Sequence, residues 1–266
     1  MAERKPIISF RNFSFQYRAQ KRPTLTDINL EIYPGERVLI AGPSGSGKST
    51  LAGCINGLNP FSNPGACTGT LTVDGVDAPH SSIFELSAHV GTVLQDPDGQ
   101  FIGLTVGEDI AFALENSCTP QDEMHAITRH AAELVGIENH LGYAPHELSG
   151  GQKQRVAVAV SMICGKDLLV FDEPTSGLDF DSMTQVAELI RRLSELGKVI
   201  FIVTHDFEFV CRTCSRVLHF DEGEMPDDIP VVMDALPKLR ELFSVKVNGS
   251  EGDREGGLGH SDGKER

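Results

Sequence analysis

The chain has 266 residues, of which 38 are acidic and 23 are lysine or arginine, so its formal net charge is −15. That length suffices for one large α/β domain with a smaller appendage. The acidic balance excludes a typical nucleic-acid-binding protein and a protein held on anionic lipid by charge, because both carry basic patches. We therefore expect no nucleic-acid partner.

Strand patterns dominate the first part of the chain. Apolar and polar residues alternate there, as in antiparallel sheets, and one short run is wholly apolar, as in a buried strand. The ranges predicted as strands are 7–10, 13–17, 25–32, 38–41 and 70–76. Residues 59–68 are rich in Pro, Gly and Ser, which predicts a loop.

Helical patterns begin near residue 105. Residues 105–141 are amphipathic and predict a helical insertion with helices at 108–115 and 122–135. From Leu148 onward helices and strands alternate, which predicts a largely parallel sheet with helices on both faces. The predicted helices are 151–164 and 183–196, and the predicted strands are 168–171 and 199–203.

A glycine-rich loop follows the predicted strand 38–41 and precedes a predicted helix at 49–55. Its spacing is G-x-x-x-x-G-K-S, the phosphate-binding loop, in which glycines let successive backbone N–H groups face phosphate oxygens. Lys48 would supply positive charge to the β- and γ-phosphates, and Ser49 a hydroxyl ligand for Mg²⁺. The candidate binding residues are Gly42, Pro43, Ser44, Gly45, Ser46, Gly47, Lys48, Ser49 and Thr50.

Two adjacent carboxylates, Asp172 and Glu173, end the apolar strand 168–171. In nucleoside triphosphatases a strand beside the phosphate loop presents its carboxyl end to the phosphates. Asp172 is then placed to hold Mg²⁺, and Glu173 to activate the attacking water as a general base. Taken alone, such a pair is equally typical of a helix cap or a turn.

A second candidate anion site is the segment Leu148-Ser149-Gly150-Gly151-Gln152. A serine hydroxyl and glycine N–H groups at the start of a predicted helix can bind an anion. The chain thus contains two phosphate-directed helix N-termini about 100 residues apart.

These motifs resemble those of the ATP-binding-cassette (ABC) ATPases over nearly the whole chain. Residues 42–50 match the Walker A motif, 148–152 the signature motif and 168–173 the Walker B motif. Four further positions match the family's Q-loop glutamine, adenine-stacking aromatic, D-loop aspartate and switch histidine. They are Gln95, Tyr17, Asp179 and His205. Phe15 lies two residues from Tyr17 on the same strand face and is the alternative to it.

The resemblance implies an α/β ABC ATPase fold: a parallel-sheet core with the phosphate loop, an N-terminal antiparallel β subdomain and a helical signature subdomain. It implies ATP and Mg²⁺ as cofactors. The residues implied to bind the metal are Ser49, Gln95 and Asp172. It also implies a head-to-tail dimer, in which the signature residues Ser149, Gly150, Gly151 and Gln152 and the D-loop Asp179 complete the site of the opposite subunit. Glu173, His205, Gln95 and Lys48 would act in hydrolysis.

The same resemblance suggests boundaries within the chain. The ABC ATPase domain would span residues 1–225, with the helical subdomain at about 96–163. Apolar residues at helical spacing suggest a short C-terminal extension at 226–247. Residues 248–266 are rich in Gly, Asp and Glu and predict a disordered tail.

The segment Asp96-Pro97-Asp98-Gly99-Gln100-Phe101 looks like the ATPases of energy-coupling-factor (ECF) importers of vitamins and metal ions. In that family the region forms a short helix carrying Gln100, beside the groove for a transmembrane T-component. The resemblance implies three partners: that T-component, a substrate-binding membrane S-component, and a second ATPase that is this chain or a related one.

The sequence also bears on where in the cell the protein lies. No apolar run approaches the roughly 18–20 residues that span a bilayer, and residues 1–6 lack the apolar core of a signal peptide. We expect a peripheral protein on the cytoplasmic face of the cell membrane, attached through its partner. The alternatives are the ATPase of a conventional ABC transporter and, with less support, a soluble ABC protein outside transport.

Overall fold

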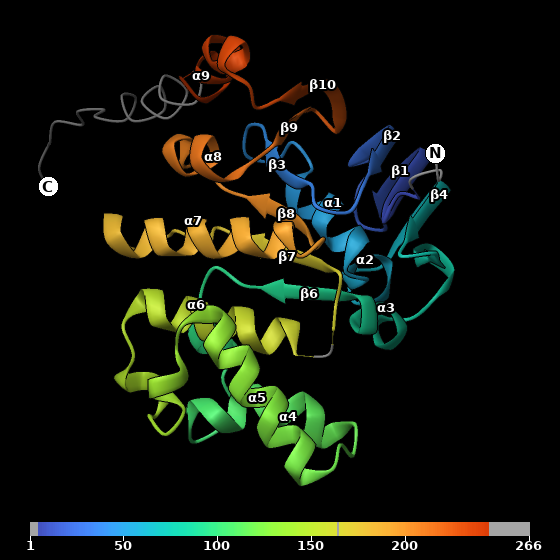
Figure 1. Ribbon diagram of the computed structural model, residues 1–266. Helices are drawn as coiled ribbons and strands as arrows, with labels where there is room; N and C mark the ends of the chain where they lie inside the picture. The colour runs from blue at the N-terminus through green and yellow to red at the C-terminus, as the bar shows by residue number, and fades with distance from the viewer. Residues whose placement is uncertain (1–4, 164, 245–266) are drawn as a thin grey trace, which may run out of the picture.

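The computed structural model describes residues 5–163 and 165–244, which form two sheets with helices packed around them (Figure 1). A four-stranded antiparallel sheet has the order β2-β1-β4-β5, and a six-stranded sheet has the order β10-β9-β3-β8-β7-β6. The strands are β1 (Ile8–Tyr17), β2 (Leu25–Ile32), β3 (Arg37–Ala41), β4 (Gly65–Val73), β5 (Val76–Asp77), β6 (Val90–Val93), β7 (Leu168–Asp172), β8 (Val199–Val203), β9 (Arg216–Asp221) and β10 (Glu224–Pro230).

Within the larger sheet β9, β3, β8, β7 and β6 run parallel, and β10 adds an antiparallel edge strand. The α-helices are α1 (Lys48–Ile55), α2 (Leu58–Phe61), α3 (Ile83–His89), α4 (Val106–Asn116), α5 (Gln121–Val135), α6 (Gly150–Met162), α7 (Phe180–Glu195), α8 (Phe207–Thr213) and α9 (Leu236–Ser244). This arrangement confirms the predicted α/β fold class, with an antiparallel N-terminal sheet beside a parallel core.

The parallel sheet is buried on both faces because successive side chains of a strand point to opposite sides. On one face Leu39, Phe171 and Ile202 pack in a cluster with residues of helices α4 to α9. On the other face Val38 and Phe201 pack in a second cluster with helix α1 and the antiparallel sheet. The side chains of each continuous apolar run in the sequence therefore pack alternately into the two clusters, one on each face of the sheet.

The two strands predicted at 7–10 and 13–17 are one strand, β1. Its pairing register with β4 shifts between Arg11 and Ser14, and Asn12 has a positive φ of 47°. This irregularity lets the strand continue past the polar residues that the sequence pattern assigned to a turn.

The prediction that residues 59–68 form only a loop was wrong at both ends. Leu58–Phe61 is the short helix α2, and residues 65–68 begin strand β4, where Gly65 pairs with Tyr17. A Cβ at Gly65 would collide with the Phe15 ring, so glycine is required for this close approach. The predicted strand 70–76 ends at Val73, because Asp74 and Gly75 have positive φ and turn the chain into β5.

Helices α4, α5 and α6 gather beside the β6 edge of the larger sheet, in green to yellow in Figure 1. Helix α4 begins with a capping box, in which the Thr105 hydroxyl accepts from Glu108 N–H and the Glu108 carboxylate accepts from Thr105 N–H. The helices expected at 108–115 and 122–135 are thus present, the first longer by three residues and the second by one.

The expected boundary between residues 225 and 226 falls inside β10, which pairs with β9 in the larger sheet. Helix α9 carries the apolar residues predicted at helical spacing, among them the fully buried Leu239. The predicted tail at 248–266 lies outside the described residues, and the division into domains stays a prediction.

Among residues 5–163 and 165–244 there is no helix with the length and apolar character that crossing a membrane requires.

We expect the buried side chains of the central strand β8 to contribute strongly to the free energy of unfolding. Phe201 is 0% exposed and joins the parallel sheet to helix α1 and the antiparallel sheet. We expect Phe201→Ala to lower the free energy of unfolding by about 3–5 kcal/mol, since it leaves a cavity in a packed core. Phe84→Ala, at a side chain that is 88% exposed, is the control and should change it by less than about 0.5 kcal/mol. Urea denaturation measures both, and equal effects would contradict this account.

Candidate nucleotide-binding site

A cavity of about 340 Å³ lies where strands β3, β7 and β8 end. Parallel strands present their carboxyl ends at one edge of the sheet, so the segments that follow them meet there. The lining residues are Tyr17, Gln20, Thr24, Ser44, Gly45, Gly47, Lys48, Ser49, Thr50, Asp172, Glu173, Val203 and His205. The structure thus joins the phosphate loop, the acidic pair and the histidine in one place.

The glycine-rich loop has three glycines with positive φ, Gly42 at 147°, Gly45 at 81° and Gly47 at 105°. A Cβ at Gly42 would collide with the Phe220 carbonyl, and one at Gly47 would stand 2.8 Å from Leu25 Cδ2. No larger residue fits at either position, so the loop can close tightly before helix α1 begins at Lys48.

Lys48 is 8% exposed, and its Nζ donates to the carbonyls of Gly42 (2.9 Å) and Pro43 (2.7 Å). Burial lowers the pKa of this ammonium, while the negative charge of Glu173 acts to raise it. The ammonium is therefore held by the loop itself, at the N-terminus of α1, where an anion is also favoured.

Asp172 and Glu173 occupy the end of β7. Burial raises the pKa of Asp172, and the neighbouring Glu173 charge adds to the effect. Glu173 has a positive φ of 47°, and its N–H donates to the Val203 carbonyl at 2.7 Å. The Glu173 carboxylate lies 3.3 Å from His205 Nε2 and accepts from the His205 N–H at 3.4 Å. The backbone conformation thus aims Glu173 toward the histidine.

Tyr17, not Phe15, lines the cavity: Phe15 is fully buried and meets the Tyr17 ring edge-on at 4.9 Å. The Tyr17 hydroxyl lies 3.1 Å from Thr50 Oγ1, and Asn59 Nδ2 donates to it at 3.3 Å. Asn59 also donates to the Thr50 carbonyl at 3.1 Å. Sequence reasoning missed Asn59, because nothing in a Pro- and Gly-rich stretch reveals a contact with a distant strand.

Five other predicted residues lie outside the lining of this cavity: Gly42, Pro43 and Ser46 of the glycine-rich loop, and Gln95 and Asp179. Gln95 follows β6, and its Nε2 donates to Ser176 Oγ at 3.3 Å. Asp179 caps helix α7 by accepting from the Ser182 N–H at 2.7 Å, and this bond lowers the pKa of Asp179.

The signature segment is also separate from the cavity. Ser149 caps helix α6, and its Oγ accepts from the Gln152 N–H at 3.3 Å while Gln152 Oε1 accepts from the Ser149 N–H at 2.8 Å. Gly150 and Gly151 lie against the segment that starts α7, where a Cβ at Gly151 would stand 2.8 Å from Ser182. The segment lies at a helix N-terminus, as expected, but a single chain does not bring it to the lining of the cavity with the phosphate loop.

The predicted metal residues show a donor set that suits Mg²⁺. Within the described residues no group of three or more His, Cys, Asp and Glu side chains is placed to hold a metal. Mg²⁺, however, is commonly held by one or two protein oxygens together with substrate phosphates and water. Ser49 and Asp172 supply such oxygens in the cavity, and a cation would offset the repulsion between Asp172 and Glu173.

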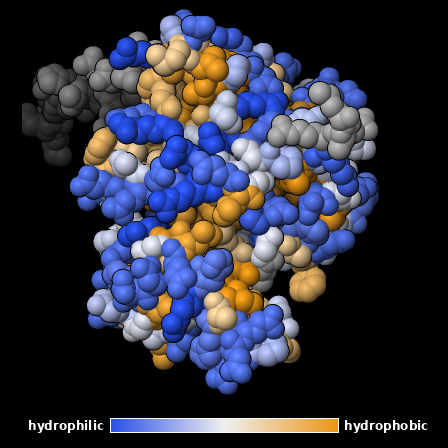
Figure 2. Space-filling model, in the orientation of Figure 1, coloured by the Kyte–Doolittle hydropathy of each residue, from blue (hydrophilic) through white to orange (hydrophobic). Residues whose placement is uncertain are grey.

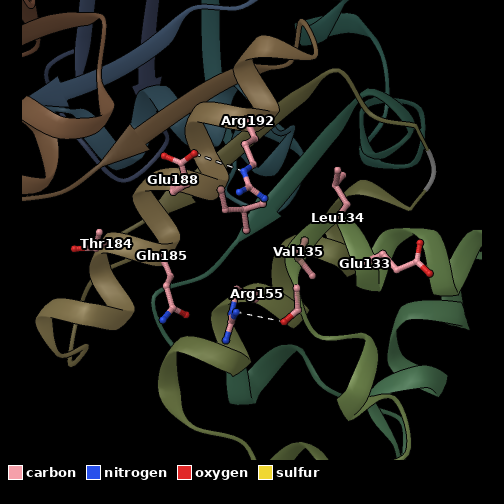
Figure 3. A pocket seen from close by; sticks show the side chains of 10 residues that line it. Glu133, Leu134, Val135, Arg155, Thr184, Gln185, Glu188 and Arg192 are labelled. Carbon is pink, nitrogen blue, oxygen red and sulfur yellow. Dashed lines mark hydrogen bonds and ion pairs between the residues drawn. The ribbon is translucent and has the colours of Figure 1, made fainter.

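A second cavity, of about 380 Å³, lies between helices α5, α6 and α7 (Figure 3). The visible face of the molecule carries several apolar patches among hydrophilic side chains (Figure 2). Arg155 lines the second cavity and donates from Nη1 to the Gly136 carbonyl at 3.3 Å, while Glu188 and Arg192 pair at 3.6 Å. This cavity contains none of the predicted site residues, so we assign the nucleotide site to the first cavity.

The raised pKa of Asp172 makes a prediction about stability. The folded state holds the proton of this carboxyl more tightly than the unfolded state, so stability falls as the pH rises through the raised pKa. Asp172→Asn cannot ionise, and we expect it to melt at a higher temperature than the parent at neutral pH without nucleotide. The two melting temperatures should converge as the pH is lowered. Asp234→Asn, at an exposed position, is the charge-matched control; a constant difference at all pH values would contradict the assignment.

Comparisons with known proteins point to one family. A family model described as "ABC transporter" matches residues 25–176. A putative ABC transporter ATP-binding protein of Clostridium perfringens is 47% identical over 271 residues, 98% of this chain and 48% of that protein. The chain spans less than half the length of such curated relatives.

Two solved structures are similar along most of their length. One is cbiO1 of Clostridium perfringens, described as part of the ABC transporter complex cbiONQ, with a TM-score of 0.79, 30% identity and coverage of 94% of this chain and 96% of that one. The other is the ATP-binding cassette MJ0796, a dimer in a post-hydrolysis state with ADP and Pi, with a TM-score of 0.71, 26% identity and coverage of 85% and 99%. With the phosphate loop, acidic pair and histidine meeting at one cavity, these likenesses show that the chain belongs to the family of ABC transporter ATP-binding proteins.

Proposed function

We propose that the chain is the ATP-hydrolysing subunit of a membrane transporter. The observation that carries this proposal is the single cavity that unites Lys48, Glu173 and His205. A nucleoside triphosphate placed there would have its phosphates on the loop and the N-terminus of α1. Its adenine would stack on Tyr17, whose ring is tied to the loop through Thr50.

The residues of the cavity divide the chemistry of hydrolysis among them. Lys48 would offset the charge of the β- and γ-phosphates, and Ser49 and Asp172 would hold Mg²⁺. Gln95, which lies outside the cavity lining on the loop after β6, would contact the metal and the attacking water. Glu173 accepts a proton from the attacking water, and His205 contacts the γ-phosphate. The 3.3 Å contact between Glu173 and His205 keeps both side chains at the same end of the site.

The separate signature segment supports a head-to-tail dimer. Ser149 and the two glycines cap the N-terminus of α6, an anion-binding arrangement that a single chain leaves away from its own phosphate loop. In a dimer these residues, with Gln152 and Asp179, would close over the nucleotide of the partner. Loss of the γ-phosphate would remove the bridge, so the dimer would open after hydrolysis. The dimeric MJ0796 neighbour supports this arrangement.

The finer proposal is an importer of the ECF type that takes up a vitamin or a metal ion. The segment 96–101 forms a 3₁₀ helix, η2 (Pro97–Gln100), as that resemblance implies. Beside it Ile102 is 68% and Leu104 is 82% exposed, an apolar surface suited to a transmembrane T-component. The likeness to cbiO1 also supports this assignment.

The Gln100 side chain contributes to this surface indirectly. Its Oε1 accepts from the Leu94 N–H at 3.1 Å, and its Nε2 donates to the Thr92 carbonyl at 3.0 Å. Gln100 therefore ties η2 to the end of β6 and to the residue that follows it. Under this proposal a substrate-binding S-component, the T-component and a second ATPase complete the complex, with this chain on the cytoplasmic face of the membrane. The ATPase of a conventional ABC transporter is the alternative.

Glu173→Gln tests the hydrolytic role. We expect this variant to bind ATP as the parent does but to turn it over at least about 100-fold more slowly, because the general base is lost. It should also accumulate as an ATP-bound dimer, seen by gel filtration. Glu195→Gln, at an exposed position on α7, is the control and should behave as the parent. Near-parent turnover in Glu173→Gln would show that Glu173 is not the base.

Leu104→Asp tests the membrane partner. The parent, affinity-purified from native membranes, should bring a small multi-span T-type protein, an ATPase and a compact S-type protein, identified by mass spectrometry. Leu104→Asp should lose these proteins and keep the ATPase activity of the isolated subunit, because a charge on an apolar docking surface is costly. Leu196→Asp, at the residue that follows α7 and whose side chain is 61% exposed, is the control. A conventional permease in the parent sample would overturn the ECF assignment, and ribosomes or DNA without a membrane protein would overturn transport.

A further inference from the structure

The side chain of Gln152 has a defined orientation in the signature segment. Its Oε1 accepts from the Ser149 N–H at 2.8 Å, as the second half of a capping box. The amide nitrogen, Nε2, therefore points away from Ser149. It lies 2.9 Å from Nε2 of His140, the last residue of the 3₁₀ helix η3 (Glu138–His140).

That contact determines the tautomer of His140. An amide nitrogen can only donate, so His140 Nε2 must accept, and the imidazole proton must be on Nδ1. The ring is held edge-on against Tyr143, with centroids 5.2 Å apart. His140 Nδ1 is buried and has no hydrogen-bond partner within the described residues.

A buried N–H without an acceptor destabilises the folded state, so stability alone does not favour histidine at this position. What the histidine does supply is one correctly placed acceptor for Gln152. A side chain that costs stability while it orients a neighbouring group is typical of functional sites rather than of packing.

We propose that His140 is a positioning residue for the signature serine. His140 holds the Gln152 amide, and the amide holds the Ser149 N–H. Since Ser149 Oγ accepts from the Gln152 N–H at 3.3 Å, its own hydroxyl proton remains to be donated to a phosphate. This inference rests on the proposed function, in which Ser149 contacts the γ-phosphate bound by the partner subunit.

Two substitutions of the full-length protein separate positioning from packing. His140→Leu removes the acceptor and the unpartnered N–H together, so we expect kcat for ATP to fall about five- to tenfold, the loss of one hydrogen bond, with no fall in melting temperature. His140→Gln can place its Oε1 near the position of the imidazole Nε2 and should restore most of the rate. ADP affinity of the monomer should be the same in all three proteins, because the signature segment acts on the partner's nucleotide.

A double-substitution cycle tests the route through Gln152. If His140 acts only through that amide, His140→Leu should cost little more once Gln152→Ala is present. His130→Leu, at an exposed histidine of α5, is the control and should keep the parent rate. Independent, multiplying losses in the double variant would overturn the proposal, as would a His140→Leu protein with the parent kcat. If the parent itself shows no Glu173-dependent hydrolysis, the proposed function falls and this inference with it.

Discussion

The pairing of three parallel strands is the constraint on which the site depends. Ile40 of β3 lies beside Val203 of β8, and Val203 lies beside Asp172 of β7. The segments that follow these strands therefore start side by side, although β3 ends at Ala41 while β7 and β8 end at Asp172 and Val203. Both faces of the sheet are buried, so a slip in register would disrupt two cores as well as the site. The geometry of the cavity is thus protected by the same packing that stabilises the fold.

The charged side chains of the cavity destabilise the folded protein when no ligand is bound. In a chain with a net charge of −15, two carboxylates lie together at the end of β7, and burial with the charge of Glu173 raises the pKa of Asp172. Lys48 is buried against carbonyl oxygens, and burial lowers its pKa. A phosphate bound by Lys48 and a cation bound by the carboxylates would each offset the free energy lost by burying these charges. The site therefore has the charge pattern of a protein that is complete only with its ligand.

The loop after β6 connects the regions that the proposed cycle must coordinate. Gln100 ties η2 to the end of β6, and Asp98 pairs with Lys153 of helix α6 at 2.7 Å. Ile102 and Leu104 are exposed on the same segment, which also carries Gln95 and, through Asp98, contacts the helix that carries the signature residues. A partner that moved this loop would therefore act both on Gln95 and on helix α6. This arrangement agrees with a subunit whose nucleotide state is passed to another protein.

The sequence by itself determined the fold class, the phosphate loop, the acidic strand end and most helices, because each depends on local spacing and on apolar periodicity. It could not show that β1 crosses its polar residues as one strand, or that Gly65 begins β4, because partner strands decide both. Only the tertiary structure distinguished Tyr17 from Phe15, and it alone brought Asn59 to Tyr17 and His140 to Gln152. These are contacts of single polar atoms between separate segments, and no periodicity along the chain records which distant atom a side chain will meet.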